Sequence, residues 1–154
     1  MMLRTHIAIN LLFILLFLPH ISSDLIFVPV ALIATALPDL DTGFSTVGKM
    51  KASRIIQFFV RHRGFFHSLT FCAIISALFS VVVPVLALPF FLGYSLHLFA
   101  DSFTFEGIKP FWPAKKSSSW RLRTGSMIET SLFVFFVLAD LLVLVFMIID
   151  NSVN

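Results

Sequence analysis

Charged residues are scarce in this sequence. Asp, Glu, Lys and Arg make up 12% of its 154 residues, against about 25% in a typical soluble domain. Hydrophobic residues make up 58% of the chain, and the mean hydropathy is +1.00. A soluble protein of this length cannot bury so much apolar surface, whereas a bilayer solvates it directly. The composition therefore indicates an integral membrane protein.

Cysteine is also nearly absent. The single cysteine, Cys72, lies inside an apolar run, which excludes an internal disulfide and a zinc site built from cysteines. The basic residues are confined to short polar segments, a distribution typical of membrane topology rather than of nucleic-acid binding. We therefore expect membrane lipid as a partner and no nucleic acid.

The apolar runs predict the fold class. We expect one all-α membrane domain, residues 1–154, with about five hydrophobic helices. The stretch 69–100 is too long for one crossing, and its Pro84 and Pro89 predict a helical hairpin. Pro38 predicts the end of the second run, and residues 53–60 are expected to form a short interfacial helix. The expected helices cover residues 7–18, 25–37, 69–83, 90–101 and 130–149.

The basic residues predict the topology. All eleven Lys and Arg residues precede the first run or follow the second and fourth runs. Five spans place these segments on one side, and the positive-inside bias makes that side cytoplasmic. We therefore expect a multi-pass protein of the cytoplasmic (inner) membrane, with its N-terminus inside and its C-terminus outside.

The first run has an alternative interpretation as a cleaved signal peptide. A basic start precedes an apolar stretch of suitable length, and two serines follow. Pro19 and His20 are unfavourable next to a cleavage site, so we expect the run, and with it His6, to be retained in the mature protein.

Histidines and carboxylates gather at the predicted cytoplasmic ends of the spans. Imidazole and carboxylate together suit zinc, manganese or iron. A site for a divalent metal is therefore expected at the cytoplasmic face. The candidate ligands are His6, Asp39, Asp41, His62, His67, His97, Asp101 and Glu129.

The spacing within this set is informative. His97 and Asp101 are four residues apart on a predicted helix, so their Cβ atoms should lie about 5–6 Å apart on one face. They could bind one metal, or Asp101 could orient His97, or the pair could simply close a helix end with a hydrogen bond. Asp39 and Asp41 follow Pro38, and in an extended turn both would point the same way and could share a cation. A solvated turn is the alternative.

Two further segments combine charge with polar chemistry. Gly64 permits a turn that would bring His62 and His67 together, and the neighbouring Arg61 and Arg63 suit an anionic group such as phosphate. The alternative is a basic membrane anchor with incidental histidines. Glu129 opens the last helix, where a carboxylate is favourable in any case. Ser68 is expected to cap the helix that follows it.

These motifs resemble the YdjM-like family of membrane-bound, metal-dependent hydrolases, which is distantly similar to the zinc-dependent phospholipase C and nuclease superfamily. The resemblance runs in order along nearly the whole chain. It rests on His6, the Leu37-Pro38-Asp39-Leu40-Asp41 segment, the His62–Ser68 segment, the Gly93–Ser102 segment, Gly107, Trp112-Pro113, and Arg123–Ser126 with Glu129. Thr42 departs from the family pattern, which often has His there.

The resemblance implies metal ligation by His6, Asp41, His62 or His67, His97, Asp101 and Glu129. It also implies phosphoester hydrolysis at a cluster of two or more metals, with zinc as the expected ion and manganese or iron as alternatives. We assign Asp39 as general base or bridging ligand and Arg61 or Arg63 as phosphate-binding residues. A membrane site favours a phospholipid or lipid-linked phosphate substrate. The alternative function is a non-catalytic protein that binds or transports a divalent metal, although transporters usually carry their ligands near the bilayer midplane.

The topology can be tested with reporter fusions. Fusions at Asn154 and between Lys115 and Lys116 should report opposite sides of the membrane, because the fifth expected span, 130–149, lies between them. Fusions that report the same side would contradict the five-span arrangement.

Overall fold

The computed structural model describes residues 1–21, 24–47 and 65–153, with the side chains of all of these except 24, 40–47, 151 and 153. Within this part the chain is all-α, as expected, and no strand forms. The expected interfacial helix 53–60 and the C-terminal Asn154 lie outside the described residues. The helices are α1 (Leu3–Phe17), η1 (Leu18–His20, a 3₁₀ helix), α2 (Asp24–Val47), α4 (Leu69–Val82), α5 (Pro84–Ser102) and α6 (Met127–Val153).

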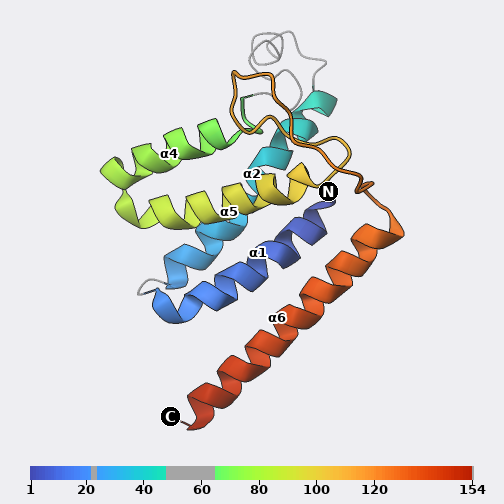
Figure 1. Ribbon diagram of the computed structural model, residues 1–154. Helices are drawn as coiled ribbons and strands as arrows, with labels where there is room; N and C mark the ends of the chain where they lie inside the picture. Colours follow the sequence, from blue (N-terminus) through green and yellow to red (C-terminus); the bar gives the residue numbers. More distant parts are fainter. Residues whose placement is uncertain (22–23, 48–64, 154) are drawn as a thin grey trace.

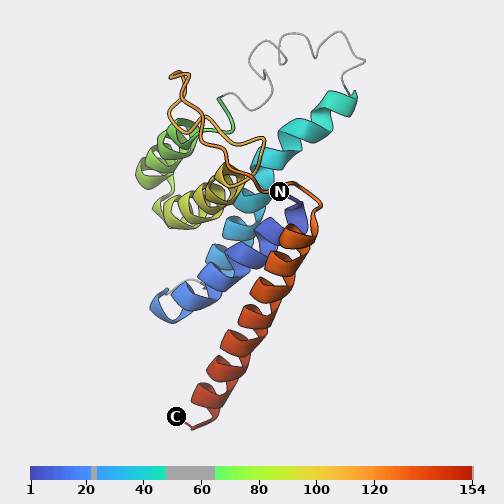
Figure 2. The ribbon, with the colours of Figure 1, turned by 45° about the vertical axis from the view of Figure 1, so that its right-hand side comes forward.

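The helices share one polar end. The starts of α1, α4 and α6 lie at this end together with the last turns of α5, and α2 runs past it (Figure 1). Helices α4 and α5 form an antiparallel hairpin, and α2 packs on α5. Helix α6 runs along α1 in both views (Figures 1 and 2), and α1 is the described helix on which it mainly packs. We call this region the polar end below.

The hairpin is confirmed, but its second helix begins earlier than expected. Helix α5 starts at Pro84, not Phe90, and includes Pro89. Proline is favourable at the first position of a helix because the N–H it lacks would have no partner there. Pro89 lies close enough to the start to cost only one hydrogen bond, to a carbonyl in the first turn.

The prediction that Pro38 ends the second helix is wrong. Helix α2 continues through Pro29 and Pro38 as far as Val47. Proline in a membrane helix is tolerated where neighbouring helices compensate for the lost hydrogen bond, and α2 makes the most extensive interhelical contact of the described part, with α5. Asp39 and Asp41 therefore lie on a helix, where positions two apart differ by about 200° around the axis. The extended turn that would have aimed both carboxylates the same way is absent.

Three of the described helices are long and apolar enough to cross a membrane by length and composition. They are Leu3–His20, Pro84–Ser102 and Met127–Asp150, whereas the apolar parts of α2 and α4 are shorter. Only 6% of the most apolar stretch of α6 is buried within the protein. Helix α6 therefore presents apolar side chains on most sides, as expected for a helix surrounded by lipid.

Close backbone approach holds α2 against α5. A Cβ atom on Gly93 would lie 2.1 Å from the carbonyl oxygen of Ala31. Small residues allow such approach, and packing of this kind stabilises helix pairs in membranes, where apolar burial gives little driving force.

We predict that Gly93→Ala destabilises the protein by about 1–3 kcal/mol, the usual cost of overpacking, because its methyl group would clash with the main chain of α2. Thermal unfolding in detergent measures the effect. Ser80→Thr adds one methyl group at an exposed position of α4 and should leave the midpoint unchanged. Equal midpoints for both variants would contradict the close-packing interpretation.

Candidate metal centre

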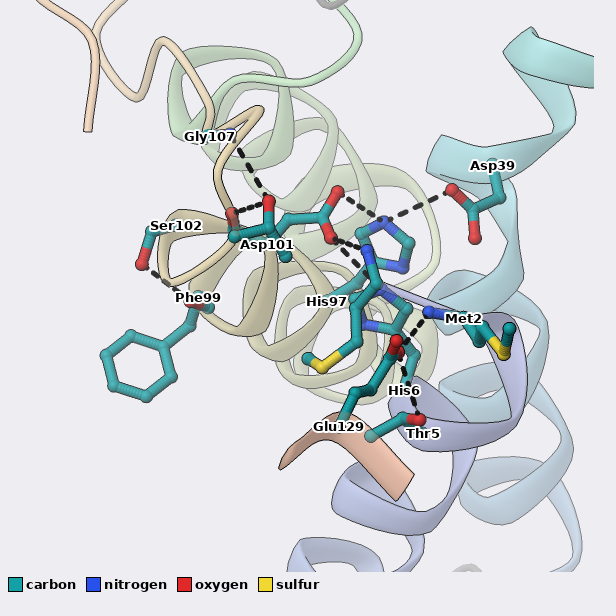
Figure 3. A network of polar contacts seen from close by, with 12 residues as sticks. Met2, Thr5, His6, Asp39, His97, Phe99, Asp101, Ser102, Gly107 and Glu129 are labelled. Carbon is teal, nitrogen blue, oxygen red and sulfur yellow. Dashed lines mark hydrogen bonds and ion pairs between the residues drawn. The ribbon is translucent and has the colours of Figure 1, made fainter. Parts of the chain in front are cut away.

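Five ionisable side chains meet at the polar end and form what we call the polar cluster: His6, Asp39, His67, His97 and Asp101 (Figure 3, which labels all but His67). They come from α1, α2, the segment before α4, and α5. The three histidines and Asp101 are at most 1% exposed, whereas the Asp39 side chain is 29% exposed. The cluster is therefore buried, with Asp39 at its accessible edge.

His97 is at the centre of the polar cluster. The His6 ring stacks on it, with ring centroids 3.8 Å apart and planes inclined by 15°. The His67 ring lies edge-on, with its centroid 5.9 Å from that of His97. The prediction that His6 faces the same site as His97 is thus confirmed. Metal binding requires the neutral form of each imidazole.

Two carboxylates approach the same histidines. Asp101 Oδ1 lies 3.2 Å from His6 Nε2, and Asp101 Oδ2 lies 3.8 Å from His97 Nε2. Asp39 Oδ1 lies 3.7 Å from His97 Nε2 on the other side. The shared face predicted for His97 and Asp101 is confirmed. The amino group of Met1 also contacts Asp101 Oδ1, at 2.7 Å, so this carboxylate joins three partners.

Hydrogen bonds on both sides of His67 fix its place. Ser68 is the N-cap of α4, as predicted, and its hydroxyl oxygen accepts the N–H of Phe71 at 3.1 Å. The Tyr94 hydroxyl, from α5, donates to the carbonyl oxygen of Phe66. The residues before and after His67 are thereby tied to α4 and α5, and the ring is held beside His97.

The arrangement fits a divalent metal. Both ring nitrogens of His6 and of His97 are buried and make no hydrogen bond of regular geometry within the described residues, and buried polar atoms without partners are unfavourable. A tetrahedral ion with bonds of about 2.0–2.2 Å holds its ligand atoms about 3.3–3.6 Å apart, close to the 3.7 Å between His97 and Asp39 and the 3.8 Å between His97 and Asp101. Two overlapping groups have suitable geometry: His6 with Asp39 and His97, and His67 with His97 and Asp101.

A family model described as YdjM inner membrane protein matches residues 1–152. The chain belongs to this family. All of the candidate ligands from His6 to Glu129 lie within the matched range. No curated protein and no solved structure matches the chain. The family description names an inner-membrane location and no reaction.

Glu129, a candidate ligand from the sequence, lies outside both groups of the YdjM-family cluster. Its carboxylate is 1% exposed and already accepts three hydrogen bonds, from the N–H groups of Met2 and Gly125 and from the Thr5 hydroxyl at 3.3 Å (Figure 3). Because Met2 and Thr5 begin α1, these bonds tie the start of α1 to the start of α6. Glu129 therefore holds His6 in place from one turn away.

Several predicted site residues lie outside the described part of the chain. They are Arg61, His62 and Arg63, and the side chain of Asp41. Asp140 is 4% exposed in the middle of α6 and is not part of the cluster.

Tyr94 and Thr5 are the functional-site residues that sequence reasoning missed. Tyr94 is the only tyrosine of the chain and precedes His97 by one helical turn, a spacing that places both on one face. Thr5 precedes His6, but no sequence pattern indicates its bond to Glu129, 124 residues away.

We predict that Glu129→Gln lowers the thermal midpoint but leaves bound metal in place. An amide retains one acceptor oxygen and brings an N–H₂ group against the other donors, and an unsatisfied buried donor costs about 1–3 kcal/mol. Metal analysis alongside thermal unfolding separates the two roles. Glu106→Gln, at an exposed loop acid, is the control. If Glu129→Gln lost its metal without a change in the thermal midpoint, Glu129 would instead be a metal ligand.

Proposed function

We propose that this YdjM-family protein is a membrane-bound, metal-dependent hydrolase that cleaves a phosphoester at the cytoplasmic face. The observation that carries the proposal is the polar cluster, in which three buried histidines and two carboxylates form two groups of three whose ligand atoms lie within 4.8 Å of one another. Zinc suits this mixed nitrogen and oxygen set best, and manganese or iron are alternatives.

The ligand set follows from the two overlapping groups. His6, Asp39 and His97 would hold an ion between α1, α2 and α5, and His67, His97 and Asp101 would hold one between α5 and the start of α4. His97 belongs to both groups, and because a neutral imidazole has one nitrogen lone pair, it would complete either group but not both at once. Catalytic metal sites commonly use three protein ligands and leave a position for water or substrate, and each group contains three.

The chemistry needs an ion, a base and a bound phosphate. A divalent metal polarises a phosphoryl oxygen and lowers the pKa of water. With an ion held by His67, His97 and Asp101, Asp39 is the candidate base, because it is the one carboxylate of the cluster with an accessible side chain, 29% exposed, and would accept a proton from an attacking water. Arg61 and Arg63, close in sequence to His67, are proposed to bind the substrate phosphate.

A phospholipid or another lipid-linked phosphate is the proposed substrate class. The cluster lies at the polar end of helices with exposed apolar side chains, including Leu3 at 42% and Met127 at 87% exposure. A substrate with an apolar tail reaches such a site from within the membrane, and its phosphate meets the cluster at the interface. The position of the cluster at one end of the helices also favours hydrolysis over transport, for which ligands near the midplane are usual.

We predict that the purified protein carries bound transition metal, and that His97→Ala, Asp101→Ala and His67→Ala each lower the metal content. Loss even of an outer-shell group typically weakens metal affinity about 10–100-fold, so loss of a ligand should do so at least as strongly. Inductively coupled plasma mass spectrometry of detergent-purified protein, after dialysis against buffered zinc, measures the content. Phosphoesterase activity should fall in the same variants.

His20→Ala is the matched control, since His20 lies in η1 at the opposite end of α1 and should not affect metal content. Stoichiometric metal that survives all three substitutions would falsify the ligand assignment. A folded, metal-loaded wild type without phosphoesterase activity would favour the metal-binding alternative, and a folded protein that binds no metal would favour a purely structural cluster.

A further inference from the structure

A groove lies on the side of α5 that faces away from the polar cluster. It has a volume of about 540 Å³, within the range of about 300–1,000 Å³ usual for ligand sites. The start of α4, the last turns of α5 and the loop 103–126 line it, through residues that include Leu69, Phe99, Ile108 and Phe111. Figure 3 shows Phe99 and Ser102 on the opposite side of α5 from His97. The groove is therefore separate from the proposed metal centre.

The groove offers a hydrocarbon environment. Its walls are mostly aliphatic and aromatic, and the two α5 hydroxyl groups in it are already used as donors. Ser95 donates to the carbonyl oxygen of Leu92 at 3.3 Å, and Ser102 donates to that of Phe99 at 2.6 Å. Of the three lining hydroxyls, only that of Ser118, at an exposed position of the loop, is left to donate to a polar ligand. An acyl chain matches this lining better than a polar metabolite does.

The loop 103–126, which lines one side of the groove, is positively charged. Lys109 is exposed and lies between two lining residues, Ile108 and Pro110. Among the described residues, no carboxylate forms an ion pair with Lys109. The loop 103–126 contains five basic residues and one acid, Glu106, a net charge of +4 by subtraction. This charge is complementary to an anionic headgroup.

The groove also lies at the depth where headgroups are expected. Trp112 and Trp120 belong to the same loop and are 41% and 63% exposed, and tryptophan is enriched at the membrane–water interface. The loop is held in place by a pair of hydrogen bonds between Ile108 and Ser118 and by a turn at Gly107, where φ is +62°. A lipid in the groove would thus have its chain along α5 and its phosphate near Lys109.

We propose that this groove is a binding site for an anionic phospholipid, with an acyl chain against Phe99 and Phe111 and the phosphate at Lys109. The site is distinct from the metal centre, so it does not depend on the proposed hydrolysis. It would set the depth of the loop 103–126, and hence of the polar end, relative to the membrane surface.

Native mass spectrometry tests the proposal. The full-length protein in detergent is mixed with equal amounts of dioleoyl-phosphatidylglycerol and dioleoyl-phosphatidylcholine, and retained lipid is counted. We expect preferential retention of phosphatidylglycerol. Lys109→Gln should reduce this preference about fivefold, the factor that one basic residue contributes at an anionic lipid surface. Arg4→Gln, which changes the net charge equally but lies in α1 and does not line the groove, should not.

A second pair of variants tests the acyl-chain part. Ser95→Phe fills the groove and should abolish retention. Ser80→Phe is its matched control, because Ser80 also donates to a carbonyl of its own helix but lies at an exposed position of α4. If Ser95→Phe does not fold, Phe111→Ser, at a 65% exposed lining residue, removes apolar wall without adding bulk and should weaken retention. Equal retention of the two lipids, or retention unaffected by the groove variants, would overturn the proposal.

Discussion

A buried carboxylate is tolerated only when positive or hydrogen-bonding groups surround it, and Asp101 imposes this requirement on the polar end. It is 1% exposed, and its two oxygens face His6, His97 and the amino group of Met1. Helix α1 must therefore reach α5 at its first turn. Because His97 also meets Asp39, α2 is drawn to the same point. The convergence of α1 with α5 thus follows from the partners that Asp101 needs, and that of α2 from the contact between His97 and Asp39.

Polar contacts and close packing matter here because the usual driving force is weak. In a bilayer, apolar side chains gain little by leaving lipid for protein, so helices associate through packing and hydrogen bonds. Helices α2 and α5 approach closely at Gly93. Helix α6, which is apolar on most sides, instead joins α1 through the hydrogen bonds of Glu129 at its first turn. The close approach at Gly93 lies one turn before His97 on α5, and the hydrogen bonds of Glu129 lie at the start of α1, next to His6.

Local sequence patterns predicted those parts of the site that depend on spacing within one element. The four-residue separation of His97 and Asp101 places them on one face of a helix wherever that helix lies. The two prolines at 84 and 89 indicated a hairpin, which brings His67 beside His97. The expectation that a proline interrupts a helix failed at Pro38, because packing of α2 on α5 outweighs the one hydrogen bond that a proline removes. Propensity describes an isolated segment, whereas Pro38 is a buried residue of an interhelical contact.

Glu129 shows why the contacts between distant segments at the candidate site could not be predicted. A carboxylate at a helix start is compatible with ligation, with stabilisation of the helix dipole or with hydrogen bonding to a distant segment. The choice depends on where residues 2 and 5 lie, and no local pattern encodes contacts across more than a hundred residues. With three donors on its two oxygens, Glu129 has little capacity left for an ion. Its position instead makes the geometry of His6 depend on α6, so the helix with the least contact to the bundle contributes to the order of its most buried site.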